Sequence, residues 1–138
     1  MIKIGDLAPN FSLKDQHNEE FNLGSYKGKK ILLSFHPLAW TRICAEQMVS
    51  LEKNYETFEK LNTIPLGVSV DTVPSKHAWA KELKISKLRL ISDFWPHGRV
   101  AQLFGIFRDE EGKIIFFKIY EIKELPDIEE IIKFLENK

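Results

Sequence analysis

A single cysteine, Cys44, closes a stretch whose residue types suit thiol chemistry. The stretch reads Pro-Leu-Ala-Trp-Thr-Arg-Ile-Cys, so Thr41 precedes the cysteine by three positions and Pro37 precedes it by seven. It starts where an apolar run ends and stops where an amphipathic pattern begins. We therefore expect Cys44 in the first turn of a helix, where backbone N–H groups favour the thiolate. A thiolate is the form of cysteine that attacks the O–O bond of a peroxide.

The residues around Cys44 can each support such an attack. The hydroxyl of Thr41 can hydrogen-bond the thiolate or a peroxide oxygen, and Arg42 adds a positive charge if it faces the site. Pro37 ends the preceding strand and can shield the sulfur from water, while Trp40 offers an apolar wall. The attack expels water or an alcohol and leaves Cys44 as a sulfenic acid. The alternative is an inert cysteine packed at the helix start, since free cysteines are among the most buried residues.

The spacing of apolar residues predicts the elements that position the cysteine. A hairpin is expected over residues 10–21, strands over residues 31–36, 64–70, 88–91 and 113–120, and helices over residues 43–62, 74–83, 98–104 and 127–135. His77 and Trp79 are expected to pack one of these helices against the sheet. Alternating strands and helices imply parallel strands joined by right-handed crossovers. The sequence thus predicts an α/β protein with a thioredoxin-like fold: a mixed central sheet, helices on both faces and an N-terminal β-hairpin.

Composition limits the classes of function. With 138 residues the chain is expected to form a single domain, residues 1–138. Lysine plus arginine number 20 and so do aspartate plus glutamate, which gives no electrostatic reason to bind nucleic acid or an anionic membrane. Apolar runs are too short to span a bilayer, and the N-terminus lacks the apolar segment of a signal peptide. One cysteine, with no CxxC pair or cysteine–histidine cluster, predicts a cytoplasmic location and no metal site.

Several motifs along the chain are similar to those of one enzyme family. Pro-x-x-x-Thr-x-x-Cys at residues 37–44 resembles the active-site motif of the peroxiredoxins, the thiol-specific antioxidant family. Gly-Asp-Leu-Ala-Pro-Asn-Phe at residues 5–11 resembles that family's N-terminal motif, and Leu-Ile-Ser-Asp at residues 90–93 resembles its Leu-x-Ser-Asp. Val-Ala-Gln-Leu-Phe-Gly-Ile at residues 100–106 looks like its Val-Ala-x-x-Tyr-Gly-Val. The resemblance covers most of residues 3–106.

The resemblance implies roles for particular residues. Cys44 matches the peroxidatic cysteine, Thr41 the threonine that hydrogen-bonds the cysteine and the substrate, and Pro37 the proline that covers the pocket. Gln47 stands at a polar position three residues after the cysteine, where the family often has glutamate or glutamine. His36 stands where the family has an aromatic residue or a histidine. It either lines the pocket or is a strand-end histidine with a backbone partner.

The resemblance also implies a reaction and its partners. The chain looks like a one-Cys peroxiredoxin, a thiol-dependent peroxidase that reduces hydrogen peroxide or organic hydroperoxides in antioxidant defence. Because there is no second cysteine, the sulfenic acid would need an external thiol, from thioredoxin, glutaredoxin or a small thiol. The implied chemistry uses no metal, haem or flavin, so no cofactor is expected. Peroxiredoxin-like domains often form dimers, which predicts a homodimer.

The chain departs from the family at the strand that carries an arginine, which stabilises the charge of the peroxidatic cysteine. If Asp109 and Gly112 match the family's Asp-x-x-Gly, the arginine position falls on Leu103, and a loop and most of a strand are absent. Such a loss would leave the central strand over residues 31–36 without a partner on one side, which is costly when buried. We expect residues 104–108 to take that place.

The replacement strand is expected to form a hairpin with residues 113–120. Arg108 would then approach Cys44 and restore the lost charge, and the alternative is a solvated hairpin arginine. A strand exchanged from a partner chain is another way to fill the gap.

Two other classes of function stay open beside the peroxidase. Loss of the arginine strand favours a non-catalytic thioredoxin-fold module that binds a partner or senses oxidation. A thiol–disulfide oxidoreductase is a weaker alternative, because the sequence has no CxxC pair.

Overall fold

The computed structural model describes residues 3–36, 38–94, 106–108, 114–117 and 127–137, with segments 106–108 and 114–117 described by their backbone alone. Seven strands form one sheet in the order β2-β1-β5-β4-β3-β6-β7. The strands are β1 (Ser12–Lys14), β2 (Glu20–Asn22), β3 (Lys30–Phe35), β4 (Thr63–Ser69), β5 (Arg89–Ser92), β6 (Ile106–Arg108) and β7 (Ile114–Phe117). The expected N-terminal hairpin is confirmed, since β1 and β2 pair antiparallel.

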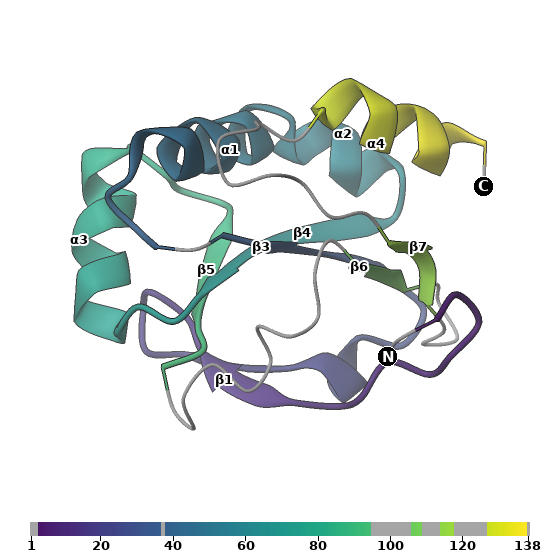
Figure 1. Ribbon diagram of the computed structural model, residues 1–138, viewed down its shortest axis with the longest axis horizontal. Coiled ribbons are helices and arrows are strands. Elements are labelled where there is room, and N and C mark those ends of the chain that lie inside the picture. The colour runs from purple at the N-terminus through teal and green to yellow at the C-terminus, as the bar shows by residue number, and fades with distance from the viewer. Residues whose placement is uncertain (1–2, 37, 95–105, 109–113, 118–126, 138) are drawn as a thin grey trace.

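The helices gather mainly on one side of this sheet. They are η1 (Leu23–Tyr26), a 3₁₀ turn, and α1 (Arg42–Lys53), α2 (Tyr55–Lys60), α3 (Val73–Glu82) and α4 (Ile128–Glu136). Figure 1 shows α1, α2 and α4 above the central strands β3 and β4, α3 at one end, and β1 of the same sheet below these strands. No helix in the described part of the chain is long and apolar enough to cross a membrane.

The centre of the sheet is parallel, and this places the start of α1 beside the start of α3. β3 pairs with β4 along its length, from Lys30 opposite Thr63 to Phe35 opposite Val68, and β4 pairs with β5. Helices connect these strands, as parallel pairing requires: α1 and α2 lie between β3 and β4, and α3 lies between β4 and β5. The carboxyl ends of the three strands therefore share one edge of the sheet.

β6 occupies the open side of β3. It runs antiparallel to β3, with Leu32 opposite Phe107, and its other side pairs with β7. Residues 104–108 were expected to pair with the first core strand and to form a hairpin with residues 113–120. Both expectations are confirmed for the described parts of these segments. β3 is thus paired on one side with β4 and on the other with β6, within a single chain. The predicted mixed sheet is also confirmed, because parallel and antiparallel pairs occur together.

Two apolar clusters cover the two faces of the sheet. Because side chains alternate along a strand, Leu32 of β3 joins one cluster, and its neighbours Ile31 and Leu33 join the other. Buried residues from all four α-helices belong to the Leu32 cluster. The second cluster contains Phe21 and other residues of the N-terminal segment. The helix expected over residues 98–104 lies outside the described residues.

Two local expectations differ from the structure. The helix expected over residues 43–62 is two helices, because the backbone of Asn54 (φ −98°, ψ 11°) leaves helical geometry. The Asn54 side-chain amide donates to the Ser50 carbonyl (2.8 Å) and so closes the last turn of α1. Of the two α3 residues expected to pack against the sheet, Trp79 is buried, but His77 is exposed.

Candidate active site

Cys44 is the third residue of α1 and lies at the edge where β3 ends. Thr41 precedes the helix with an extended backbone (φ −98°, ψ 151°), and its carbonyl accepts the N–H of Ala45 at 2.9 Å. The expectation that the cysteine stands in the first turn of a helix is confirmed. Its side chain is only 5% exposed and belongs to the helix-side core cluster. The thiol therefore experiences the positive end of the helix dipole in surroundings that hold little water.

Thr41 and Arg42 differ in how they face this thiol. The Thr41 hydroxyl donates to the Leu38 carbonyl at 3.0 Å and makes no capping bond to the helix. Arg42 points into solvent: its side chain is 81% exposed and pairs with Glu46 at 3.4 Å. Arg42 was expected to add a positive charge only if it faced the site. Its side chain does not face the site.

The loop that leads into α1 is fastened to the segment after β4. The Ala39 N–H donates to Asp71 Oδ2 at 2.7 Å, and the Ser69 hydroxyl donates to the same oxygen at 2.6 Å. Trp40 has a φ of 68°, in the left-handed region that residues other than glycine rarely adopt. Its indole Nε1 donates to the Ser75 hydroxyl at 3.2 Å, and more than half of the side chain faces solvent. These bonds fix where α1 begins.

Gln47 ties α1 to β3 one turn after the cysteine. Its side chain is buried, and its amide Nε2 donates to the hydroxyl of Ser34. A side-chain bond between a helix and a strand resists rotation of the helix about its own axis. Gln47 is therefore placed to keep Cys44 facing inward.

His36 follows β3 directly and is buried. Its ring lies against Trp79 of α3, with 5.4 Å between the ring centroids, and its backbone N–H donates to the Val68 carbonyl at 2.9 Å. Burial, and next the charge of Lys76, hold the pKa of His36 well below its usual 6.5, while the backbone of Ser34 acts weakly in the opposite direction. Neither ring nitrogen completes a well-formed hydrogen bond with a described residue. The lowered pKa favours the neutral imidazole form of His36 at neutral pH.

Lys76 is the residue that sequence reasoning missed. It lies in the first turn of α3, and its side chain is 0% exposed. Burial lowers the pKa of Lys76 from 10.5 to about 7, while the charges of Asp71 and then Cys44 act to raise it. The signal was present in the sequence: Lys76 precedes Trp79 by three positions and Ala80 by four, the spacing of one helix face, and both of those residues are buried.

Two predicted site residues are described only in part or not at all. Pro37 lies outside the described residues. Arg108 is described by its backbone, which lies opposite Ile31 near the start of β3. Cys44 follows the other end of β3, and a strand extends by roughly 3.3 Å per residue. The register of β6 therefore does not bring the Arg108 backbone to the edge where α1 begins.

Comparisons with known proteins identify the family to which the chain is similar. The AhpC/TSA family model matches residues 4–125 of the chain. Alkyl hydroperoxide reductase E of Mycobacterium tuberculosis is 38% identical over 113 residues, which are 81% of this chain and 73% of that protein. Peroxiredoxin Bcp of Escherichia coli is 34% identical over 109 residues, which are 79% of this chain and 68% of that protein.

Solved structures share the fold. A reduced 2-Cys peroxiredoxin of Plasmodium vivax superposes with a TM-score of 0.85 at 24% identity, covering 96% of this chain and 80% of that one. Peroxidoxin BcpB of Mycobacterium tuberculosis gives a TM-score of 0.83 at 20% identity, covering 99% and 98%. These likenesses show the fold and confirm the predicted thioredoxin-like architecture. Together with the family model and the sequence relatives, they lead to one conclusion: the chain belongs to the AhpC/TSA family, the peroxiredoxins.

Proposed function

We propose that this chain is a thiol-dependent peroxidase that reduces hydrogen peroxide or organic hydroperoxides at Cys44. The thiolate sulfur attacks one peroxide oxygen, so that an S–O bond forms as the O–O bond breaks. The second oxygen takes a proton and leaves as water or an alcohol, and Cys44 becomes a sulfenic acid. The observation that carries the proposal is the position of Cys44 in the first turn of α1, inward-facing and nearly shielded from water.

Residues around Cys44 support this reaction in different ways. The Thr41 hydroxyl exchanges its bond to the Leu38 carbonyl for one to the thiolate or the peroxide oxygen. Gln47 keeps α1 in place against β3 through Ser34. Pro37 covers the pocket, a role taken from the family resemblance.

The cycle is completed by an external thiol. In the described part of the chain Cys44 is a free thiol, and the sequence holds no second cysteine to resolve its sulfenic acid. Thioredoxin, glutaredoxin or a small thiol would attack the oxidised sulfur, form a mixed disulfide with Cys44 and release water. A second thiol would then attack the sulfur of the first, so that the two external thiols form a disulfide and Cys44 leaves as the thiolate. We also propose that the chain is a single peroxiredoxin domain, acts as a homodimer and works in the cytoplasm in antioxidant defence.

Sulfenic acid trapping tests the proposal. Reduced protein is mixed with near-stoichiometric hydrogen peroxide, the sulfenic acid is trapped with a dione reagent, and the labelled residue is identified by mass. The expected result is rapid labelling at Cys44 alone, with sustained peroxide consumption once a thiol is added. Cys44→Ser is the control and should neither label nor turn over.

Two outcomes of this experiment would indicate a function other than peroxidase. Labelling no faster than that of a free cysteine would refute the peroxidase and leave a non-catalytic module. Rapid labelling without turnover by any of the three classes of thiol would identify a sensor of oxidation.

A further inference from the structure

We propose that Lys76 is the base and the counter-cation of Cys44: its amine takes the thiol proton, and the resulting ammonium stabilises the thiolate. The inference deepens the proposed function, on which it rests, because it names the charge that prepares Cys44 for the peroxide. Lys76 of α3 would thus supply the positive charge near Cys44 that was expected from Arg108.

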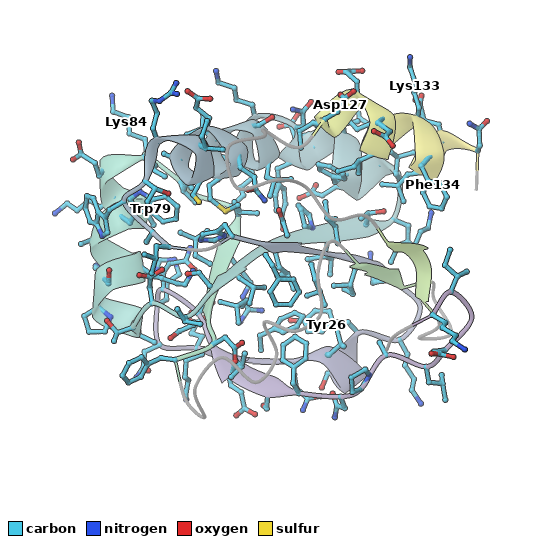
Figure 2. All side chains as sticks on the ribbon, viewed as in Figure 1. Tyr26, Trp79, Lys84, Asp127, Lys133 and Phe134 are labelled. Carbon is cyan, nitrogen blue, oxygen red and sulfur yellow. The ribbon has the colours of Figure 1, made fainter. Side chains whose placement is uncertain are left out.

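Lys76 is buried in a way that is unusual for a lysine. The side chain has no exposed surface, and no described residue provides a hydrogen-bond partner for its Nζ. A lysine that serves only for packing keeps its amino group in water at the end of a flexible apolar stem. Here the whole side chain lies on the inner face of α3 with Trp79 and Ala80. Trp79, labelled in Figure 2, marks where that face meets the core beneath α1.

Charged groups of other segments act on Lys76. Its interacting groups include Asp71 from the loop after β4, Cys44 from α1 and His36 from the end of β3. His36 cannot be an anionic partner, because an imidazole is either neutral or positively charged. Asp71 already accepts two hydrogen bonds, from the Ala39 N–H and the Ser69 hydroxyl. Of these three groups, Cys44 is the one whose charge changes with the chemistry of the site.

The proton balance of the pair is simple. The thiol and the amine together become a thiolate and an ammonium, so one proton moves from Sγ to Nζ and the net charge stays constant. After the thiolate has attacked the peroxide, the proton on the ammonium is available to the leaving hydroxide or alkoxide. The pair begins and ends each oxidation uncharged, as a buried site with little water requires.

Alkylation of the lone cysteine tests the proposal without peroxide. Rates of reaction with iodoacetamide are measured across pH for the wild type, Lys76→Met and Lys81→Met; Lys81 lies on the same helix and is exposed. Lys76→Met should move the pH midpoint of the profile upward by about one unit or more and slow alkylation at neutral pH about tenfold. Lys81→Met should leave both unchanged. Identical profiles for the wild type and Lys76→Met would overturn the proposal.

A second measurement leaves Lys76 intact, in case the substitution impairs folding. Lysine Cε is isotopically labelled, and the titration of Lys76 is followed by NMR in the wild type and in Cys44→Ser. Loss of the thiolate should lower the pH at which Lys76 titrates, because coupling between two sites is reciprocal. Equal titration midpoints would refute the pairing. Either measurement can succeed if peroxide turnover is absent, so a failure of the proposed function is distinguishable from a failure of this inference.

Discussion

Lys76 and Cys44 both stand in the first turn of a helix, and the helix dipole acts on them in opposite directions. The positive end of α1 stabilises a thiolate, whereas the positive end of α3 opposes an ammonium. Burial also disfavours the ammonium, since its Nζ has no hydrogen-bond partner among the described residues. The folded state therefore carries an unfavourable residue beside its one thiol, and the pairing proposed above is a physical reason to keep it there.

The hydroxyl of Thr41 can be tested by a substitution that keeps its shape. Thr41→Val removes the donor but preserves branching, and it should slow the reaction with hydrogen peroxide roughly tenfold to a hundredfold, the effect of one lost hydrogen bond to a charged group. Alkylation by iodoacetamide, which has no peroxide oxygen to bind, should slow much less. Stopped-flow kinetics on both reagents measures the split. Thr41→Ser is the control and should react almost as the wild type does; equal slowing with both reagents would show that the hydroxyl only supports the helix start.

The lowered pKa of His36 predicts how the free energy of unfolding depends on pH under acidic conditions. Its pKa is lowered well below 6.5 by burial and by the charge of Lys76, so below about pH 6.5 the unfolded chain binds a proton that the folded chain does not. Stability is therefore full above this pH and is lost as the pH falls below it. His36→Phe should remove that loss, and its advantage over the wild type should grow by up to about 1.4 kcal/mol per pH unit on the acid side.

Urea denaturation at a series of acidic pH values measures the two slopes. The matched control is His17→Phe, at an exposed position, which should keep the slope of the wild type. Parallel stability curves for His36→Phe and the wild type would contradict the buried neutral imidazole.

At the scale of elements, close contact between α1 and the sheet holds the cysteine in position. Gly67 of β4 lies close to the side chains above it: an added Cβ would lie 2.9 Å from Leu90 Cδ2 and closer still to the sulfur of Met48 on α1, so that these side chains would have to shift. Met48 stands one turn after Cys44 and is fully buried. The absence of a side chain at position 67 therefore leaves the space that the Met48 side chain of α1 occupies.

Gly67→Ala should accordingly lower the free energy of unfolding by about 1–3 kcal/mol, the usual cost of overpacking. Urea denaturation measures it. The matched control is Gly67→Ala in a protein that also carries Met48→Ala. Met48→Ala removes the sulfur that would lie closest to the added Cβ. In that background Gly67→Ala should cost clearly less, so the two changes are non-additive. Additive losses would mean that Met48 does not compete for the space beside Gly67.

Most elements could be predicted from the sequence because their apolar spacing is unambiguous, whereas positions that depend on tertiary contacts could not. Residues 64–70 are mostly apolar and do not alternate with polar residues, and β4 occupies Thr63–Ser69. The break at Asn54 was missed because apolar spacing continues through it, and only the backbone reveals the interruption. Lys76 was missed because a lysine is assumed to face water. Its spacing to Trp79 and Ala80 places it on the buried face of α3, and this signal outweighs the usual preference of a lysine for the surface.

The whole molecule joins the site to its main core. Cys44 belongs to the same apolar cluster as Leu51 of α1, Trp79 of α3 and Leu135 of α4. A charge introduced there acts on the stability of the entire fold, since the cluster includes all four α-helices. The protonation of Lys76 should therefore be measurable as a global property and not only in the reactivity of Cys44.

Lys76→Met should raise the free energy of unfolding at neutral pH and remove a dependence on alkaline pH. The pKa of Lys76 is about 7 in the folded protein, lowered by burial, against 10.5 ordinarily. Below about pH 7 both states hold the proton, and the cost of burying the charge acts in full. Between pH 7 and pH 10.5 only the unfolded chain binds it, so the stability of the lysine protein rises with pH.

The advantage of methionine should thus be largest below about pH 7 and shrink by up to about 1.4 kcal/mol per pH unit toward pH 10.5. Both proteins carry Cys44→Ser, so that titration of the thiol does not contribute to the difference. Loss of the Cys44 charge moves the lower limit of this window downward, because that charge raises the pKa of Lys76. Urea denaturation across the window measures both curves, with Lys81→Met as the exposed control. If the free energies of unfolding of the lysine and methionine proteins differ by the same amount at every pH, Lys76 keeps its proton in the folded protein. There would then be no neutral amine to receive the proton of Cys44.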